Sequence, residues 1–350
     1  EIHERLVGSE MCIRDRSYFI FQSVGYVIDV YRGKLSAQKN PLKYGLFVSF
    51  FPQMVQGPIS RYDQLAPQLL SQRSLDWRDL KLGIQLCLWG YFKKLVIADR
   101  AAVLVNAVIT ENCPYGGAII ASGILFYCIQ LYCDFSGGID ITRGVARMFG
   151  IDMAENFRRP IFAMSLTEYW RRWHITLGAW MRDYVFYPLS LSKTFGKLSR
   201  WARTHIKGTG GKIFATSLAT FIVYLIIGIW HGASWNFVLW GVYFGVLLVL
   251  EKLFLLRWLK RLPAVLRHIY ALVLVTISWT LFAFTEISKG AAWCKAMFSG
   301  VLFDSSSLYL LLTYGPMLLI CALAATPLGK RFYEKLGTRL GQRALTVVDC

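Results

Sequence analysis

The sequence predicts an all-α polytopic membrane protein. Of its 350 residues, 55% are hydrophobic and only 17% are charged, and the mean hydropathy is +0.42. A soluble domain usually carries about a quarter charged residues. Several apolar stretches approach the roughly 20 residues that a helix needs to cross a bilayer. These observations exclude a soluble enzyme with a single membrane anchor.

The formal net charge is +18, but its distribution argues against nucleic acid as a partner. Basic residues cluster in short loops between apolar segments, as the positive-inside rule describes. No recognised nucleic-acid motif is present. The eight cysteines show no C-x-x-C pair and no metal-ligand spacing, so we expect neither a disulfide framework nor a metal site.

Residues 1–16 (EIHERLVGSEMCIRDR) differ in character from the rest of the sequence. They are polar, lack the apolar core of a signal peptide, and resemble translated sequencing-adapter sequence. We interpret them as a non-native leader. Residues 17–350 are then a single transmembrane domain, without internal repeats or low-complexity linkers.

The first part of this domain is irregular. Residues 17–30 are apolar but short, and residues 44–69 are interrupted by Pro52, Gly57 and Pro58. Irregular backbone at membrane depth survives only where it is buried in protein or lines a cavity. Residues 44–69 therefore form either a re-entrant segment that lines a cavity or an ordinary interfacial loop.

Two apolar stretches come next, residues 80–95 and 95–111. Lys93 and Lys94 interrupt them, and we expect these long side chains to snorkel to an interface.

Residues 118–135 predict a membrane-spanning helix. Asp134, Asp140 and Arg143 stand at or just past its end. These acids either pair with nearby arginines or help to shape a polar site.

Residues 157–189 are rich in Trp and Arg, which is typical of an amphipathic helix at the membrane interface. Ser165 or Thr167 is the expected N-cap, and Glu168 and Arg172 form an i,i+4 pair. Helical spacing places one set of side chains broadly along one face: Trp170, Trp173, His174, Leu177 and Trp180. The excess of basic residues over residues 158–212 predicts a cytoplasmic loop.

Residues 221–250 are almost wholly apolar, with His231 as the one titratable residue. An ionisable side chain inside a membrane segment is a functional-site hypothesis by default. The alternative is a histidine that is hydrogen-bonded between packed helices. Two more spans are expected at residues 268–284 and 308–325.

Two long motifs resemble a known family. They are LYCDFSGGIDITRGVARMFGIDMAENFRRPIFAMSLTEYWRRWHITLGAWMRDYVFYPL and GIWHGASWNFVLWGVYFG. Both resemble the membrane-bound O-acyltransferase (MBOAT) family, and the closer similarity is to its bacterial branch that acetylates exported polysaccharides such as alginate. SFFPQMVQGPISRYDQLAPQL is also similar to that branch. The resemblance covers most of residues 17–330.

This resemblance implies an MBOAT-like helical bundle around a funnel, with re-entrant and amphipathic helices near its floor. Family members normally have several membrane helices before the segment that residue 17 begins. We therefore expect this chain to be truncated at its N-terminus.

The resemblance also implies a site. The near-invariant histidine of the family maps onto His231, and its second characteristic histidine maps onto His174. We assign both to the catalytic site. The substrate-binding or supporting residues that we expect around them are Trp230, Ser234, Trp235, Asn236, Arg171, Arg172, Trp173 and Asp183.

Acyl transfer from a thioester to a hydroxyl requires a base, stabilisation of a developing oxyanion and exclusion of water. A neutral His231 can supply the base, and we expect His174 to support it. Arg171 and Arg172 either attract a phosphate-bearing donor or anchor the loop on the positive-inside side. Ser234 lacks a G-x-S-x-G setting, which argues against a serine nucleophile.

The predicted function is a multi-pass acyltransferase of the bacterial inner (cytoplasmic) membrane. It moves an acyl group, by expectation acetyl, from a cytoplasmic thioester such as acetyl-CoA toward hydroxyls of an exported or cell-surface polysaccharide. We expect no permanently bound cofactor, and we expect membrane lipids and extracytoplasmic acetylation proteins as partners.

Three alternatives remain open. The first is D-alanyl transfer from a carrier protein to teichoic acid, which the same family includes. The second is a transporter in which His231 relays protons, which predicts broken helices in repeated halves that are not visible here. The third is a non-catalytic scaffold that tolerates loss of His231.

Overall fold

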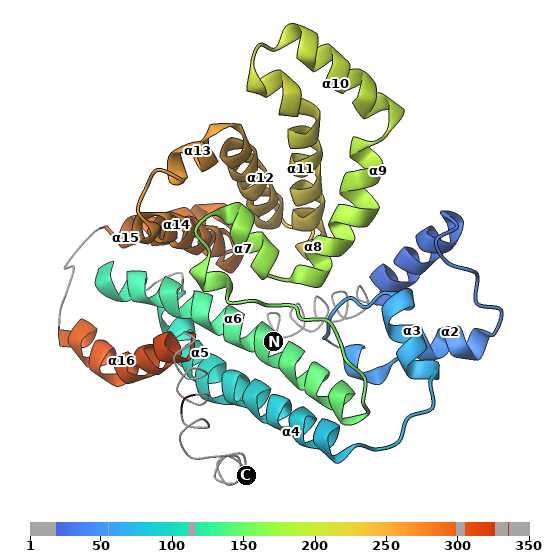
Figure 1. The fold of residues 1–350 in the computed structure, drawn as a ribbon. Coiled ribbons are helices and arrows are strands. Elements are labelled where there is room, and N and C mark those ends of the chain that lie inside the picture. The colour runs from blue at the N-terminus through green and yellow to red at the C-terminus, as the bar shows by residue number, and fades with distance from the viewer. Residues whose placement is uncertain (1–18, 55, 111–116, 299–304, 326–334, 336–350) are drawn as a thin grey trace.

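The computed structural model describes residues 19–54, 56–110, 117–298, 305–325 and 335, and this part of the chain contains helices and no strand (Figure 1). Besides a helix over Phe19–Tyr31, the helices of ten residues or more are α4 (Trp77–Tyr91), α5 (Asp99–Val108), α6 (Gly117–Met148), α10 (Lys193–His205), α11 (Thr209–His231), α12 (Trp235–Leu250), α14 (Ala264–Ala283), α15 (Ile287–Ala296) and α16 (Ser305–Ala325). The shorter α-helices are α2 (Pro41–Val48), α3 (Tyr62–Leu70), α7 (Leu166–Arg172), α8 (Ile175–Met181), α9 (Tyr187–Ser190) and α13 (Leu256–Leu259). Segments of 3₁₀-helix lie at Phe51–Gln53 and Pro160–Phe162, and π-helical segments lie at Phe92–Ala98, Arg182–Phe186 and Glu251–Leu255.

Four helices in the described part of the chain are long and apolar enough to cross a membrane. They are Ile119–Met148, Thr209–His231, Trp235–Leu259 and Ala264–Ala283. This confirms the all-α polytopic class. The apolar stretch of residues 221–250 forms two helices rather than one, because the chain breaks between α11 and α12. Of two shorter apolar stretches, Phe19–Tyr31 forms a helix of its own and Ser307–Cys321 lies within α16.

Helix α6 lies near the middle of the molecule, with α4 and α5 along one side of it (Figure 1). It is longer than expected and continues to Met148, so Asp134, Asp140 and Arg143 lie inside it rather than past its end.

Four glycines let α4 and α6 approach closely. A Cβ at Gly90 would collide with the carbonyl oxygen of Gly137, and one at Gly83 would collide with that of Gly144. The converse clashes hold at Gly137 and Gly144. Helices in membranes associate through such small residues because backbone contact replaces the missing hydrophobic driving force. The two contacts fix the antiparallel register of α4 against α6.

The segment over residues 44–69 folds as α2, a 3₁₀ turn and α3, which share a core with the end of α6 that includes Phe47, Leu65 and Ala146. Gln53 is buried, and its Nε2 donates to the carbonyl oxygen of Phe47 at 3.1 Å. The irregular backbone is thus packed against protein, as a re-entrant segment requires. Its insertion into the membrane stays a prediction.

The glycine contact gives a test of this register. We expect Gly144→Ala to lower the free energy of unfolding by about 1–3 kcal/mol, because the new methyl group would meet the Gly83 oxygen and the backbone of Cys87. Thermal unfolding of the detergent-solubilised protein measures the effect. Gly45→Ala is the control, since nothing lies within 4 Å of a Cβ at that position. Equal loss in both variants would contradict the close packing.

Candidate functional site

His231 is the last residue of α11, at the break before α12. A side chain at the next position, Gly232, would collide with the ring of Phe237, so only glycine fits this turn. Asn236 is 1% exposed and its Nδ2 donates to the carbonyl oxygen of Leu281 at 3.3 Å, which ties the start of α12 to α14. The packing of Gly232 against Phe237 and the hydrogen bond from Asn236 to Leu281 therefore fix the turn that follows His231.

The His231 ring is only partly buried and lies among aromatic rings. Its centroid is 4.7 Å from Trp230, 5.2 Å from Trp240 and 5.3 Å from Phe282. These rings limit the positions that the imidazole can adopt.

His174 occupies a second break, between α7 and α8. We predicted a single amphipathic helix through this region, and that prediction was wrong. Ser165 caps α7, as one of the two expected caps, but the helix ends at Arg172 and His174 adopts a left-handed backbone conformation with φ of 45°. A non-glycine residue in this region carries strain, and such strain is commonly found at functional sites.

The hydrogen bonds of His174 define its tautomer. Asn156 Oδ1 accepts from the backbone N–H of Thr176 at 3.0 Å, which fixes that amide atom as oxygen. His174 Nδ1 lies 3.2 Å from the same oxygen, so Nδ1 must carry the hydrogen. His174 Nε2 is then an unprotonated acceptor, and it is buried without a hydrogen-bond partner among the described residues. A buried polar atom of this kind calls for an explanation.

The environment keeps the His174 ring neutral. Burial and, to a smaller extent, the charge interaction with His231 together lower the pKa of His174 from an ordinary value of 6.5 to about 3. His174 is only 5% exposed. The two histidines are therefore close enough for a charge on one to disfavour a charge on the other.

Three aromatic rings connect the two helix breaks, and we call Trp173, Trp279 and Phe282 the aromatic wall. Trp173 lies 5.4 Å from Trp279, and Trp279 lies 5.4 Å from Phe282, which contacts His231. On the other side, Phe135 of α6 contacts His174 edge-on at 4.9 Å. The tertiary structure thus brings the two predicted catalytic histidines to one region from α7–α8 and from α11–α12.

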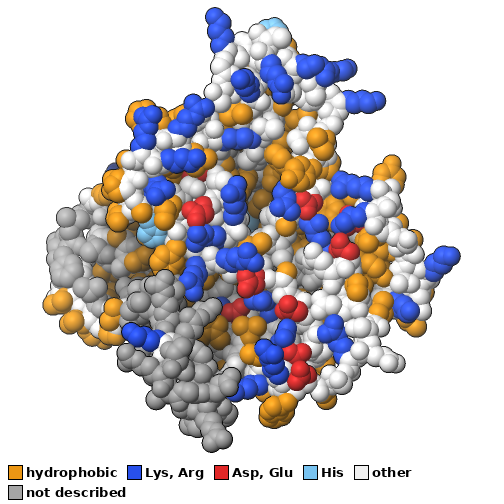
Figure 2. Space-filling view, in the orientation of Figure 1, with side chains coloured by type: hydrophobic (Ala, Val, Ile, Leu, Met, Phe, Trp, Pro, Cys, Tyr) orange, Lys and Arg blue, Asp and Glu red, His pale blue; other side chains and the backbone are white. Residues whose placement is uncertain are grey.

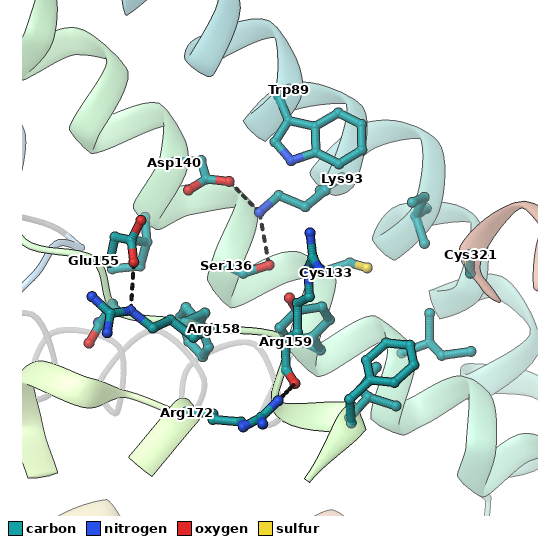
Figure 3. A pocket seen from close by; sticks show the side chains of 18 of the residues that line it. Trp89, Lys93, Cys133, Ser136, Asp140, Glu155, Arg158, Arg159, Arg172 and Cys321 are labelled. Atoms are coloured by element: carbon teal, nitrogen blue, oxygen red, sulfur yellow. Dashed lines mark hydrogen bonds and ion pairs between the residues drawn. The ribbon is translucent and has the colours of Figure 1, made fainter. Parts of the chain in front are cut away.

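Figure 3 shows a cavity of 470 Å³. Asn156 lines this cavity, and its Oδ1 also contacts His174 Nδ1. Five of the residues that line the cavity are basic and two are acidic: Lys93, Arg143, Arg158, Arg159 and Arg172, with Asp140 and Glu155. The excess of positive charge favours an anionic ligand, and Arg matches the geometry of phosphate oxygens. Lys and Arg side chains also gather over the outer surface on the side drawn in Figure 2.

Lys93 lines this cavity, and its predicted position at a membrane interface was wrong. Lys93 does not snorkel to an interface: it is 8% exposed, and its Nζ donates to Ser136 Oγ at 3.1 Å and to Asp140 Oδ2 at 2.5 Å. It lies in the π-helical segment after α4, and such segments are frequent at functional sites. Lys94 instead pairs with Asp134 and is half-exposed. An ionisable residue within an apolar run was the signal that could have identified Lys93.

Comparisons with known proteins show the family of this chain. A family model described as "MBOAT, membrane-bound O-acyltransferase family" matches residues 34–207. A protein of Azotobacter vinelandii named "Probable alginate O-acetylase AlgI" is 33% identical over 283 residues, which cover 81% of this chain and 53% of that protein. The chain belongs to the membrane-bound O-acyltransferase family.

Two other relatives are more distant. The "Peptidoglycan O-acetyltransferase" of Helicobacter pylori is 28% identical over 80% of this chain and 56% of that protein. The "Teichoic acid D-alanyltransferase" of Bacillus subtilis is 27% identical over 77% of this chain and 66% of that protein. The chain spans about half the length of the alginate-type relatives that it matches.

The match to the membrane-bound O-acyltransferase model includes His174 and ends before His231. The catalytic assignment of both histidines stays a prediction. Among the described residues, no group of three His, Cys, Asp or Glu side chains is arranged to hold a metal ion.

The other predicted site residues lie in different places: some are near the two histidines, and others line the cavity or lie outside it. Trp230, Trp173 and Asn236 lie in or beside the region of the two histidines. Arg172 lines the cavity and pairs with Glu168, whereas the neighbouring Arg171 is exposed and does not line it.

Three further predicted residues lie at the edges of this region. Trp235 is 73% exposed, and Ser234 Oγ donates to the carbonyl oxygen of Thr285 at 3.5 Å. Asp183 belongs to a different cluster, where it pairs with Arg61 and Arg182. We keep these residues as predictions without a contact to either histidine.

The pKa of His174 predicts a pH dependence. Below pH 6.5 the unfolded chain protonates this residue, while the folded protein keeps it neutral down to about pH 3. Unfolding then takes up a proton, so this residue makes the protein less stable as the pH falls from 6.5 toward 3. We expect His174→Gln to remove that part of the dependence. Melting temperatures of both proteins across this range test it, and parallel curves would contradict the neutral buried histidine.

Proposed function

We propose that this chain is a membrane O-acyltransferase that transfers an acetyl group from a thioester donor toward hydroxyls of an exported or cell-surface polysaccharide. The observation that supports this most directly is the convergence of the two histidines: a buried neutral His174 and a partly exposed His231 share one aromatic wall. Membership of the family and the names of the alginate-type and peptidoglycan relatives support the reaction class.

The proposed reaction uses His231 as the general base. The hydroxyl oxygen of the acceptor attacks the thioester carbonyl carbon while His231 takes the hydroxyl proton. The carbon–sulfur bond then breaks, and the thiolate that leaves receives the proton from His231. The products are the acyl ester, a free thiol and the neutral histidine. The surrounding rings limit the access of water that would hydrolyse the donor.

Exposure decides which histidine we assign as the base. His174 is 5% exposed, so a bulky sugar hydroxyl cannot reach its ring without local rearrangement. His231 is only partly buried and stands at a helix end. We therefore keep the supporting role for His174: its Nε2 is an acceptor beside the reacting region, and its neutral state avoids a second positive charge next to His231.

We place the phosphate-bearing part of the donor in the 470 Å³ cavity. Arg158 pairs with Glu155, and Arg172 pairs with Glu168. The structure gives the Arg159 side chain no carboxylate partner among the residues that it describes, and Figure 3 shows this side chain reaching into the same space as Lys93. Acetyl-CoA is the donor that we propose, because its phosphates suit this set of cations.

We further propose a multi-pass location in the bacterial inner membrane and an extracytoplasmic protein partner that completes delivery to the polysaccharide. Acetyl is preferred to D-alanyl because the alginate-type relative is 33% identical and the teichoic-acid relative 27% identical.

The reaction is tested by loss of His231. We expect the wild-type chain, expressed in a host without surface-polysaccharide acylation, to add ester-linked acetate that mild base releases. His231→Ala should reduce the yield by roughly 10²–10⁴-fold, because positioned proton transfer is lost. Release of D-alanine instead of acetate would move the chain to teichoic-acid chemistry. Unchanged ester in well-expressed His231→Ala would contradict the assignment and favour a scaffold.

The donor site is tested separately with Arg159→Gln. We expect the KM for acetyl-CoA in membrane vesicles to rise by about tenfold or more with little change in kcat, because one charge-assisted hydrogen bond to phosphate is lost. Arg200→Gln on α10 removes an exposed positive charge away from the cavity and serves as the control. A similar rise in KM in both variants would indicate general attraction by surface charge rather than a site.

A further inference from the structure

We infer that Glu251 is a positioning residue, which sets the place of α7 and hence of His174 relative to His231. This inference rests on the proposed function, since it concerns the same site. Glu251 comes directly after α12 and begins the π-helical segment Glu251–Leu255. The apolar pattern of residues 221–250 did not predict a role for Glu251, which directly follows that stretch.

Glu251 is fully buried, with 0% exposure, and lies within the membrane-length helix Trp235–Leu259. A carboxylate in such a place is costly and marks a functional-site hypothesis. The next residue, Lys252, does not neutralise it: its Nζ donates to Thr216 Oγ1 at 2.7 Å. The structure gives Glu251 no ion pair with a described Lys or Arg, so its charge is stabilised in another way.

Four donors converge on the two carboxylate oxygens. Oε1 accepts from the backbone N–H of Leu166 at 2.7 Å and from the Tyr270 hydroxyl at 3.2 Å. Oε2 accepts from the backbone N–H of Thr167 at 2.8 Å and from its hydroxyl at 2.6 Å. Leu166 and Thr167 are the first two residues of α7, so Glu251 satisfies amide groups that a helix start leaves without partners. The positive end of the helix dipole also favours the negative charge.

The four donors around Glu251 require both of its carboxylate oxygens to act as acceptors. An ionised carboxylate accepts at both atoms, whereas a glutamine amide must present an NH₂ group at one of them. In Glu251→Gln, that NH₂ would face an N–H donor of Leu166 or Thr167. The side chain has nearly the same size in both proteins, so the substitution changes the hydrogen bonding and leaves the packing volume intact.

A second contact ties the middle of α7 to α12. The Trp170 ring lies 4.8 Å from Phe244 and 5.5 Å from Trp240, and Trp240 is 5.2 Å from His231. Glu251 holds the start of α7, and these rings hold its middle. The helix then ends at Arg172, directly before Trp173 and His174. A shift of α7 along α12 would therefore move His174 relative to His231.

The test compares Glu251→Gln with Glu286→Gln in the full chain. Glu286 is an exposed carboxylate that pairs with Lys289, so its substitution makes the same chemical change outside the site. We expect Glu251→Gln to speed amide exchange at Leu166 and Thr167 by about tenfold, equivalent to one net hydrogen bond. We expect kcat to fall by roughly 100-fold with little change in the KM for acetyl-CoA, because the reacting groups are misplaced while donor contacts persist.

Two milder variants keep the inference testable if Glu251→Gln does not fold. Thr167→Val removes one hydroxyl donor to Oε2, and Tyr270→Phe removes the donor to Oε1 that lies outside α7. We expect a loss of kcat in Thr167→Val that exceeds the loss in Tyr270→Phe. Equal effects in these two variants, or normal kcat and amide exchange in Glu251→Gln, would overturn the inference.

The same experiment separates this inference from the proposed function. Absence of acetyl transfer by the wild-type protein would overturn the proposed function. Amide exchange at Leu166 and Thr167 would then still decide whether Glu251 positions α7, because that measurement does not depend on turnover.

Discussion

Burying a polar group in an apolar helical bundle is costly unless the group is hydrogen-bonded, and this constraint arranges much of the molecule. Asn156 is the clearest case: its Oδ1 accepts from the Thr176 backbone and side chain and receives the hydrogen of His174 Nδ1. The Thr176 hydroxyl in turn accepts from the N–H of Ile59 at 3.0 Å. One buried amide thus joins three distant segments, and removing it would leave several donors unsatisfied.

Two buried charges, Lys93 and Glu251, also have partners within the protein. Lys93 of the segment after α4 is paired with Asp140 of α6, and Glu251 after α12 is paired with the start of α7. The glycine contacts between α4 and α6 also bring Lys93 close to α6, since a Cβ at Gly137 would lie 3.4 Å from Lys93 Cβ. The region where α4 and α6 pack closely is therefore also the region where Lys93 and Asp140 pair.

Interruptions of helices build the site. His174 and His231 each stand where a helix is interrupted, and both lie against the same group of aromatic rings. In a continuous helix, the direction of each side chain would instead follow from the helical repeat. The cavity adjoins this region through Asn156, which lines it and also contacts His174. A donor whose anionic part occupies the cavity can then direct its thioester toward the histidines, which is the spatial order that the proposed reaction requires.

Local pattern in the sequence was sufficient for the class of fold and for some local contacts. Apolar length predicted the membrane spans at α11, α12 and α14, and the i,i+4 rule predicted the Glu168–Arg172 pair. The functional importance of His231, which its isolation in an apolar run suggested, stays a prediction. The resemblance of the two motifs to a family supplied His174. These features depend on neighbouring residues or on motif identity, so they can be read without coordinates.

Only the tertiary structure decided the rest. Helical periodicity placed Trp170 to Trp180 on one continuous helix, yet the chain breaks at His174, because contacts to Asn156, 18 residues earlier in the sequence, stabilise a conformation that local preference disfavours. The burial of Lys93 depends on Asp140, 47 residues away, and the role of Glu251 depends on amides 84 and 85 residues away. Sequence periodicity reports which face of a helix is apolar. It carries no information about which distant donor will satisfy a buried acceptor, and that pairing positions the histidines.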